Sequence, residues 1–194
     1  MHRTLGLGKV IAHLAARPAP VLLDLGAAVG SNIAFFGEQV GCRMLVADLA
    51  AEIDRHESGA GDQALARSLD AWFTQPDESV DGVLCWDLFD FLVPEAAAVV
   101  AHHVTRVLSA NGVVFGMFRT AAPPVHHYTR HVIIDDTHLR FRPYGQPSRE
   151  IALLENREII RLFAGLRVSD SFLLQTHVRE ILFRKPEYLA HRQR

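Results

Sequence analysis

The feature that most constrains the fold is a short apolar run over residues 21–25 that opens into a glycine-containing loop and then into a helical pattern. In the stretch DLGAAVGSN, Gly26 and Gly30 lack a Cβ where the backbone must turn tightly between a strand and a helix. About twenty residues later a second apolar run ends in Asp48. A strand, a glycine loop, a helix and an acidic strand end in this order are typical of a nucleotide-binding α/β sheet.

The chain continues this alternation of short apolar runs and longer helical patterns, which indicates a parallel sheet. We expect parallel strands over residues 21–25, 43–47, 66–69, 80–86 and 113–118. We expect helices over residues 5–16, 31–41, 94–108 and 151–166, and a polar one from Asp48 towards Gly61.

Two later segments depart from the alternation. YTRHVIID and THLRFRPY alternate with period 2 around Asp135 and Asp136, which predicts a β-hairpin inserted before the last helix. The stretch SFLLQTHVREILFRK supplies two strands, over residues 172–175 and 178–184. These strands are too close along the chain to be parallel, so the last one is expected to be antiparallel.

Together the patterns predict an α/β fold with a doubly wound, Rossmann-like sheet of about seven strands. Most strands are parallel and the last is antiparallel, helices cover both faces, and the hairpin is inserted after the fifth strand. The chain has 194 residues, of which 49% are hydrophobic, enough for one substantial core. We therefore expect a single domain over residues 1–194, with the insertion at about 119–150.

The composition of the chain indicates the cellular compartment in which it is expected to act. No apolar stretch approaches the roughly 20 residues of a membrane-spanning helix, and His13 and Arg17 interrupt the apolar N-terminal segment, which favours a helix over a signal peptide. Only two cysteines are present, Cys42 and Cys85, and the second lies in an apolar run where a reduced, buried thiol is usual. These features predict a cytoplasmic protein without a membrane anchor.

The charge distribution argues against nucleic acid as a partner. The formal net charge is −2, with acidic residues prevailing in the first part of the chain and basic ones in the last. The basic residues alternate with acidic ones instead of forming a run, so no continuous positive stripe for a phosphate backbone is indicated.

The motifs resemble those of class I S-adenosylmethionine-dependent methyltransferases. DLGAAVG and VADL are similar to the family's first motif, an acidic residue followed by Gly-x-Gly-x-Gly, and to its acidic second strand end. SLDAW resembles the adenine-contacting turn after strand 3, DGVLCWDLFDFL the fourth-strand motif, and RVLSANGVVFG the fifth-strand entry. The resemblance covers roughly residues 20–118 and 151–185, and Ala28 departs from the pattern where the family most often has its middle glycine.

The resemblance implies S-adenosyl-L-methionine as the cofactor, held at the carboxyl ends of the first strands. The implied cofactor-binding residues are Asp24, Gly26, Ala28, Gly30, Asn32, Asp48, Asp70, Ala71 and Trp86. Two alternatives stay open: an NAD-type Rossmann domain, and a methyltransferase-like module that binds ligand or partner without catalysis. The chain length and the final antiparallel strand disfavour the first.

Methyl transfer requires few catalytic groups, because the sulfonium charge of the cofactor already activates the methyl group. A general base near the acceptor is still useful. The candidates are Asp87, at the exit of the fourth strand, and His127, in a cluster with His126, Tyr128 and His131. The alternatives are a capping carboxylate for Asp87, and a polar loop or a metal site for the histidines. No Cys/His spacing matches a structural zinc site, so no metal is predicted.

The acceptor is predicted to be a small molecule, with a peptide as the alternative. Methyltransferases acting on amino groups of nucleic acid bases resemble one another in an Asn/Asp-Pro-Pro-aromatic motif after strand 4, where this chain has WDLF. The residues expected to contact the substrate are His126, Tyr128, Arg140 and Arg142. With Arg130 and Tyr144, the hairpin arginines can form a lid for an anionic acceptor. The equal alternative for the hairpin is a homodimer contact or a cover for a sheet edge.

Overall fold

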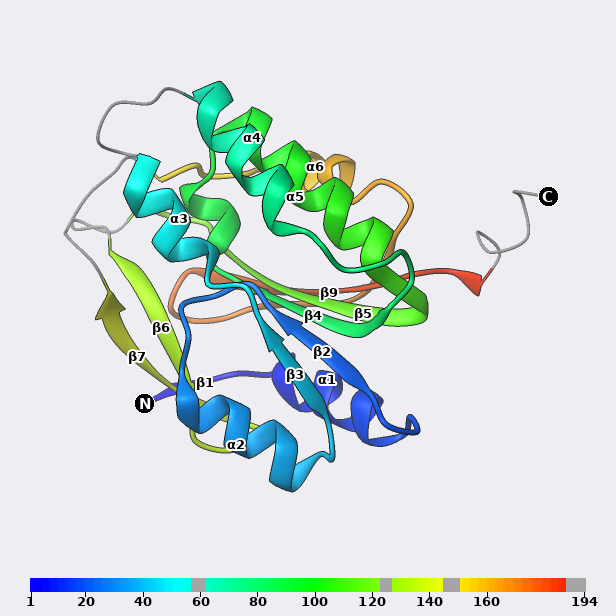
Figure 1. Cartoon of the computed structure of the whole chain (residues 1–194). Helices are drawn as coiled ribbons and strands as arrows, with labels where there is room; N and C mark the ends of the chain where they lie inside the picture. The colour runs from blue at the N-terminus through cyan, green and yellow to red at the C-terminus, as the bar shows by residue number, and fades with distance from the viewer. Residues whose placement is uncertain (57–61, 123–126, 145–150, 188–194) are drawn as a thin grey trace.

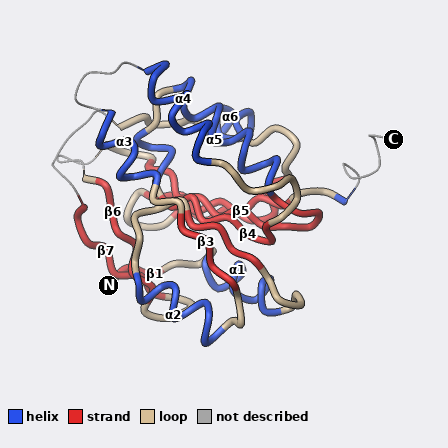
Figure 2. Tube along the Cα trace, in the orientation of Figure 1, coloured by secondary structure: helices blue, strands red, loops and turns tan. Residues whose placement is uncertain are grey.

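The computed structural model describes residues 1–56, 62–122, 127–144 and 151–187. A six-stranded sheet lies between two layers of helices, and a three-stranded sheet lies beside it (Figure 1). Figure 2 shows the two sheets in red, with helices above and below the larger one. The chain is thus an α/β structure with helices on both faces of its main sheet.

The main sheet has the order β3-β2-β4-β5-β9-β8. Its strands are β2 (Val21–Asp24), β3 (Arg43–Val46), β4 (Val80–Trp86), β5 (Leu108–Arg119), β8 (Arg167–Leu173) and β9 (Val178–Arg184). Strands β3, β2, β4 and β5 pair in parallel, whereas β9 is antiparallel to both β5 and β8. The predicted doubly wound, mostly parallel sheet with an antiparallel last strand is confirmed.

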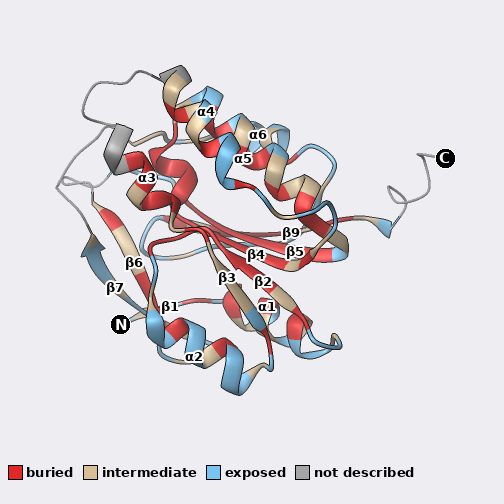
Figure 3. Ribbon diagram, viewed as in Figure 1, coloured by how far each residue is buried: buried red, intermediate tan, exposed pale blue. Residues whose placement is uncertain are grey.

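Two separate apolar layers flank this sheet. Helices α1 (Leu7–Ala15) and α2 (Gly30–Gln39) lie on one face, and α3 (Leu49–His56), α4 (Asp62–Trp72), α5 (Pro94–Val107) and α6 (Asn156–Leu162) lie on the other (Figure 1). Residues 82–86 of β4 and 112–118 of β5 are all buried, because helices cover both faces there (Figure 3). This burial explains why the two strands contain almost only apolar residues.

The predicted third parallel strand is wrong. Residues 66–69 lie within α4, and the main sheet has six strands in the described part of the chain. The apolar side chains of this segment, Leu65, Leu69 and Phe73, are spaced four residues apart, and all three are buried. A spacing of four fits one face of a helix, and packing against α5 therefore decides in favour of the helix.

The predicted helix over residues 151–166 is shorter than expected. Residues 151–155 are not helical, and the amide of Ala152 donates to the backbone oxygen of Asp90 at 2.8 Å. Helix α6 begins only after Glu155, whose side chain forms a reciprocal capping box with Glu158. The following strand starts earlier than predicted, at Arg167, because an edge strand tolerates exposed polar residues that mask its pattern.

The inserted hairpin is confirmed, and it gains an N-terminal strand that the sequence did not indicate. Strands β6 (Tyr128–Ile133) and β7 (His138–Tyr144) pair antiparallel, as predicted, and β1 (His2–Arg3) pairs with β7. These strands form the three-stranded sheet with the order β1-β7-β6. A strand of two residues is set by its partner, so no local pattern could predict it.

A buried carboxylate fixes the chain between β1 and α1. The amides of Leu5 and Gly6 donate to Glu180 Oε2 on β9 at 2.8 and 2.7 Å. Glu180 is fully buried, and its negative charge lies at the N-terminus of α1, where helix amides lack partners. This contact connects the N-terminal segment to the last strand of the main sheet.

We expect Glu180→Ala to lower the free energy of unfolding by about 2–4 kcal/mol, because two amides lose their charged acceptor. Urea denaturation followed by circular dichroism measures the change. Glu38→Ala is the matched control: Glu38 is exposed on α2, and its replacement should change stability by less than about 0.5 kcal/mol. Equal stability of the two variants would contradict the anchoring role of Glu180.

Candidate functional site

The carboxyl ends of β2 and β4 meet at the glycine loop, because the register places Asp24 opposite Leu84 and next to β3. Asp24 is buried, and its Oδ1 accepts hydrogen bonds from the Gly26 amide at 2.9 Å and from Trp86 Nε1 at 2.7 Å. A Cβ on Gly26 would lie 2.4 Å from Trp86 Cδ1. The predicted residues Asp24, Gly26 and Trp86 therefore form one close-packed unit.

Asp48 lies at the same edge of the sheet, two residues after the end of β3. Its Oδ2 accepts a hydrogen bond from the Ala28 amide of the glycine loop at 3.2 Å, and its Oδ1 accepts one from Ala51 at 3.4 Å. Asp48 has a φ of 43°, in the left-handed region, which ends the strand sharply. Ala28 is exposed, so its methyl group does not fill the interior of the loop. Strand end and loop are thus brought together as the spacing predicted.

The side chain of Asn32 connects the start of α2 to the inserted hairpin. Its Nδ2 donates to the backbone oxygen of His131 at 2.8 Å, and its Oδ1 accepts from the amide of Ile133 at 3.0 Å. Asn32 is buried, and both ends of its amide are occupied by β6. Gly30, by contrast, has open space around its missing Cβ. A cofactor role for Asn32 stays a prediction, whereas its role in holding His131 is visible.

The family resemblance implied that Asp70 and Ala71 lie at the end of a strand. In the structure they lie in the last turn of α4. Asp70 pairs with His103 at 2.7 Å on the C-terminal half of α5. The end of α4 is fixed there too, because Arg106 donates to the backbone oxygen of Phe73 at 3.1 Å. Since β5 begins where α5 ends, this region is near the amino ends of the parallel strands. The placement of Asp70 and Ala71 beside the glycine loop is therefore wrong.

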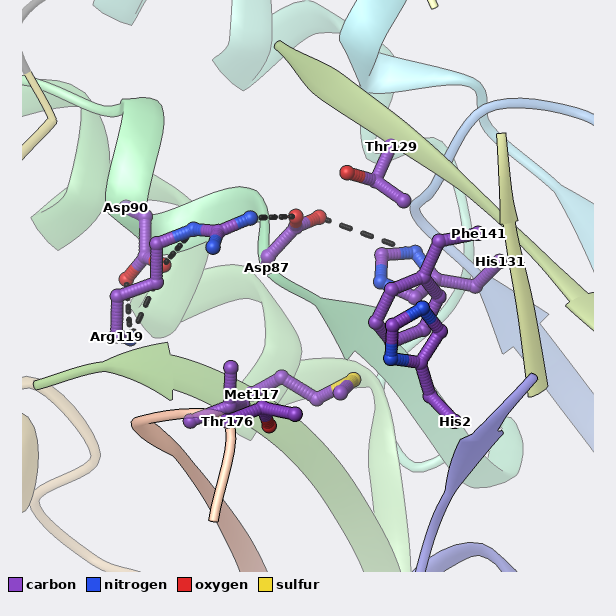
Figure 4. A pocket seen from close by; sticks show the side chains of 10 residues that line it. His2, Asp87, Asp90, Met117, Arg119, Thr129, His131, Phe141 and Thr176 are labelled. Carbon is purple, nitrogen blue, oxygen red and sulfur yellow. Dashed lines mark hydrogen bonds and ion pairs between the residues drawn. The ribbon is translucent and has the colours of Figure 1, made fainter. Parts of the chain in front are cut away.

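A cavity of about 230 Å³ lies between β4, β5, β9 and the three-stranded sheet. Figure 4 shows a charged group, formed by Asp87, Asp90 and Arg119, facing the rings of His131, Phe141 and His2. The other residues that line the cavity are Met117, Thr129, Thr176 and Val178. Among the described residues no group of three or more His, Cys, Asp and Glu side chains is arranged to hold a metal ion.

On one side of this cavity the Arg119 guanidinium lies between the carboxyl groups of Asp87 and Asp90. Arg119 lies 3.7 Å from Asp87 Oδ2 and 3.7 Å from Asp90 Oδ2. Burial and the neighbouring charge of Asp87 raise the pKa of Asp90 well above its usual range, against the opposing effect of the Arg119 amide and guanidinium. Asp90 therefore tends to hold a proton, and the charges of Asp87 and Arg119 balance each other.

His131 faces these three side chains from β6. Its Nδ1 lies 3.8 Å from Asp87 Oδ1, and the side chain is buried. Burial lowers the pKa of His131 below 6.5; Asp87 opposes this shift, and the positive charge of Arg119 adds to it. The imidazole is thus neutral at pH 7 and free to accept a proton, with a carboxylate near enough to stabilise the resulting charge.

Trp86 joins the glycine loop to the cavity. Its indole nitrogen donates to Asp24, while its ring stacks on the ring of His131 with a centroid distance of 4.8 Å and an interplanar angle of 4°. Trp86, the last residue of β4, therefore contacts both Asp24 at the glycine loop and His131 at the cavity.

Within the described residues, the structure does not bring the other predicted acceptor residues into the cavity. His126 lies outside the described residues. His127 precedes β6 and is not among the lining residues, and Tyr128 packs against Phe91 with a ring distance of 4.3 Å. Arg140 and Arg142 pair with Val132 and Arg130, on the face of the hairpin opposite to His131 and Phe141. None of the described residues among them lines the cavity, so the geometry of the cavity does not support His127 as the base or Tyr128, Arg140 and Arg142 as acceptor contacts.

The sequence missed Arg119 and His2, and it named His131 only as a neighbour of His127. The available signal was the period of the hairpin: Thr129 and His131 are two residues apart and share one face, which is the face towards the sheet. His127 precedes the strand, outside this alternation. For Arg119 and His2 no local signal existed, because tertiary contacts alone bring the end of β5 and the N-terminal strand to the cavity.

Asp24 makes folding sensitive to pH. Burial raises the pKa of Asp24 from 3.8 to about 6, despite the opposing hydrogen bonds from Gly26 and Trp86. The folded chain therefore binds this proton more tightly than the unfolded chain, and the resulting stability is present below pH 3.8 and is lost as the pH rises through about 6.

We expect the wild-type chain to lose up to about 3 kcal/mol of stability, relative to Asp24→Asn, between pH 4 and pH 7.5. Urea denaturation of both proteins across this pH range gives the two free energies of unfolding. In their difference the titration of all other groups cancels. Parallel stability curves for the two proteins would show that Asp24 is not protonated in the folded state.

Comparisons with known proteins agree with this architecture. No protein-family model and no curated protein sequence matches the chain. Among solved structures, the chain is similar to the 1,6-didemethyltoxoflavin-N1-methyltransferase of Burkholderia thailandensis, solved with 1,6-didemethyltoxoflavin and S-adenosylhomocysteine. The identity is 19%, the match covers 93% of this chain and 77% of that one, and the TM-score is 0.55.

Two further structures show the same likeness. A SAM-dependent methyltransferase from Methanosarcina mazei is 14% identical over 91% of this chain and 97% of its own, with a TM-score of 0.53. The 4+2 cyclase SpnF is 10% identical over 93% of this chain and 80% of its own, with a TM-score of 0.57. The chain thus has the fold of the class I methyltransferases, a fold that also occurs in a cyclase.

Proposed function

We propose that this chain, which has the class I methyltransferase fold, binds S-adenosyl-L-methionine and transfers its methyl group to a small-molecule acceptor. The observation that carries the proposal is the Trp86–His131 stack, which joins two different groups of polar residues. On one side are the glycine loop, Asp24 and Asp48, and on the other is a cavity with a neutral buried histidine.

The residues at the loop fit this cofactor. Asp24 and Asp48 supply two carboxyl groups, which suit a ligand carrying a sulfonium and an ammonium charge, and Asp48 at the strand end suits ribose hydroxyls. Because Gly26 has no Cβ, the loop can lie close against Trp86. The space around Gly30, at the start of α2, is open. When bound, the cofactor supplies an electrophilic methyl group, so the protein needs only to orient and deprotonate the acceptor.

His131 is the general base in this proposal, in place of the predicted His127. The imidazole of His131 would take the proton of an acceptor O–H or N–H. The bound cofactor would supply the methyl group, its S–CH3 bond breaking so that S-adenosylhomocysteine is the leaving group. Asp87 stabilises the imidazolium that forms, because its carboxylate lies 3.8 Å from Nδ1. Asn32 positions His131 by holding the backbone on both sides of residue 132.

The cavity favours a small molecule over a polymer. Its volume of about 230 Å³ is small compared with the usual 300–1,000 Å³ of ligand pockets. Cys42 and Cys85 are both free and buried, which agrees with the reducing cytoplasm as the place of action. No helix in the described part of the chain is long and apolar enough to span a membrane.

Calorimetric titration with S-adenosylmethionine, S-adenosylhomocysteine and NAD in parallel tests the proposal. We expect micromolar binding of the two adenosyl ligands and none of NAD, followed by S-adenosylhomocysteine release in an acceptor screen. A folded protein that binds neither adenosyl ligand is not a methyltransferase. Binding without turnover of any acceptor would instead support a binding module.

We expect Asp48→Ala to weaken S-adenosylmethionine binding by about 1–3 kcal/mol, because hydrogen bonds to a charged carboxylate are lost. The same titration measures the loss. Asp77→Ala is the control, since Asp77 is exposed and pairs with Arg106 on another part of the surface. Unchanged affinity in Asp48→Ala would remove Asp48 from the cofactor site.

A further inference from the structure

The N-terminal strand forms one wall of the cavity. His2, on β1, lines the cavity together with Phe141 of β7 and His131 of β6. The ring of His2 stacks on Phe141 at 3.9 Å with an interplanar angle of 9°, and Phe141 meets His131 edge to face at 5.0 Å and 72°. Figure 4 shows the three rings gathered on one side, facing Asp87 and Arg119 on the other.

The position of His2 is fixed by several contacts. Strand β1 pairs with β7 through His2 and Arg3, and the amide of Thr4 donates to the backbone oxygen of Thr137 at 2.8 Å. The next two amides are held by buried Glu180. The N-terminal segment is thus attached both to the hairpin and to the main sheet, so His2 is held at the cavity by structure on both sides.

The opposite wall carries little net charge. Arg119 lies between two carboxyl groups, Asp87 and Asp90, so its charge is already neutralised within the protein. The expected arginine lid for an anionic acceptor is also absent from the cavity, since Arg140 and Arg142 lie on the other face of the hairpin. An uncharged ligand therefore suits these walls better than an anion.

We propose that His2 is a specificity-determining residue of the acceptor site, and that the site takes a small, uncharged, planar ring bearing a hydroxyl or N–H group. The proposal rests on the proposed function for the identity of this cavity as the acceptor site. A planar ring packs favourably against His2, Phe141 and His131, and it presents its proton to His131. The volume of about 230 Å³ limits the ligand to one or two rings.

Phenol and cyclohexanol are the probes, because they have the same size and hydroxyl group and differ in aromaticity. Saturation-transfer NMR titrations give the affinity of each for the wild-type chain with saturating S-adenosylhomocysteine, and again without it. The test variant is His2→Ala, and the matched control is Arg3→Ala, the neighbouring exposed residue that does not line the cavity. Circular dichroism checks that both variants are folded.

We expect phenol to bind the wild-type chain at least about threefold more tightly than cyclohexanol, which is the size of one aromatic contact. His2→Ala should lose this preference and Arg3→Ala should retain it. Equal binding of the two probes, absence of phenol binding, or an unchanged preference in His2→Ala would each overturn the proposal. Failure of the proposed function is seen separately, as loss of S-adenosylhomocysteine binding while the phenol preference persists.

Discussion

His131→Ala is expected to lower the turnover of the acceptor by about 10²- to 10⁴-fold while leaving S-adenosylmethionine affinity within about twofold. The substitution removes the buried imidazole that faces Asp87 across the cavity. Without it the acceptor must lose its proton to water. Release of S-adenosylhomocysteine, measured with an acceptor found by screening, gives the turnover.

The pH profile separates a base from a merely structural histidine. Burial lowers the pKa of His131, so the acid limb of turnover in the wild-type chain should lie below pH 6.5 and should disappear in His131→Ala. Asp87→Asn removes the negative charge that opposes this shift, and it should move the limb to lower pH still. His127→Ala, which changes a histidine outside the cavity, should keep both rate and profile.

Retention of turnover within about threefold in His131→Ala would exclude His131 as the base. An equal loss in His127→Ala would instead point to disturbance of the hairpin as a whole. His127 precedes β6 and does not line the cavity, so the comparison isolates the side chain that faces the cavity.

Gly26→Ala is expected to destabilise the chain by about 1–3 kcal/mol and to weaken adenosyl-ligand binding by at least tenfold. The added Cβ would lie 2.4 Å from Trp86 Cδ1, 3.0 Å from its Nε1 and 3.3 Å from Asp24 Oδ1. Trp86 has no space to retreat, because it is buried, hydrogen-bonded to Asp24 and packed between His131 and Phe115. Displacement of the indole would break its bond to Asp24 and disturb the loop.

Gly37→Ala provides the matched control, since a Cβ on Gly37 meets nothing within 4 Å. Gly37 lies inside α2, where alanine is favoured over glycine by up to about 1 kcal/mol. This variant should therefore be at least as stable as the wild type and should bind S-adenosylhomocysteine unchanged. Urea denaturation and calorimetry measure both quantities, and normal binding by Gly26→Ala would refute the tight packing of the loop.

The glycine loop illustrates what a sequence can predict. Strand β2, the loop and α2 follow one another within about twenty residues, and each depends on local properties: apolar side chains, missing Cβ atoms and helical spacing. Asp48 could be placed with them because parallel strands joined by a helix end at the same edge of a sheet. The contact of Asp48 with the Ala28 amide confirms this placement.

The segment around Asp70 illustrates where the same reasoning failed. The match of SLDAW to a strand-end motif placed Asp70 beside the cofactor, but Leu65, Leu69 and Phe73 pack as one helical face. Short apolar patterns fit both a strand and a helix, and packing against α5 made the choice. For the hairpin, the two strands were predicted correctly. The side chains predicted to contact the acceptor, Arg140 and Arg142, lie on the face away from the cavity.

The sequence by itself determined the order of most elements, apart from β1 and α4, together with the mostly parallel sheet, its reversed last strand and the residues of the glycine loop. These follow from periodicity and chain connectivity, which act between residues close along the chain. Only the tertiary structure decided the composition of the cavity, where His2, Asp87, Arg119 and His131 meet from four separate strands or turns. The period of a strand shows which residues share a face, but which face is covered, and by what, depends on long-range packing.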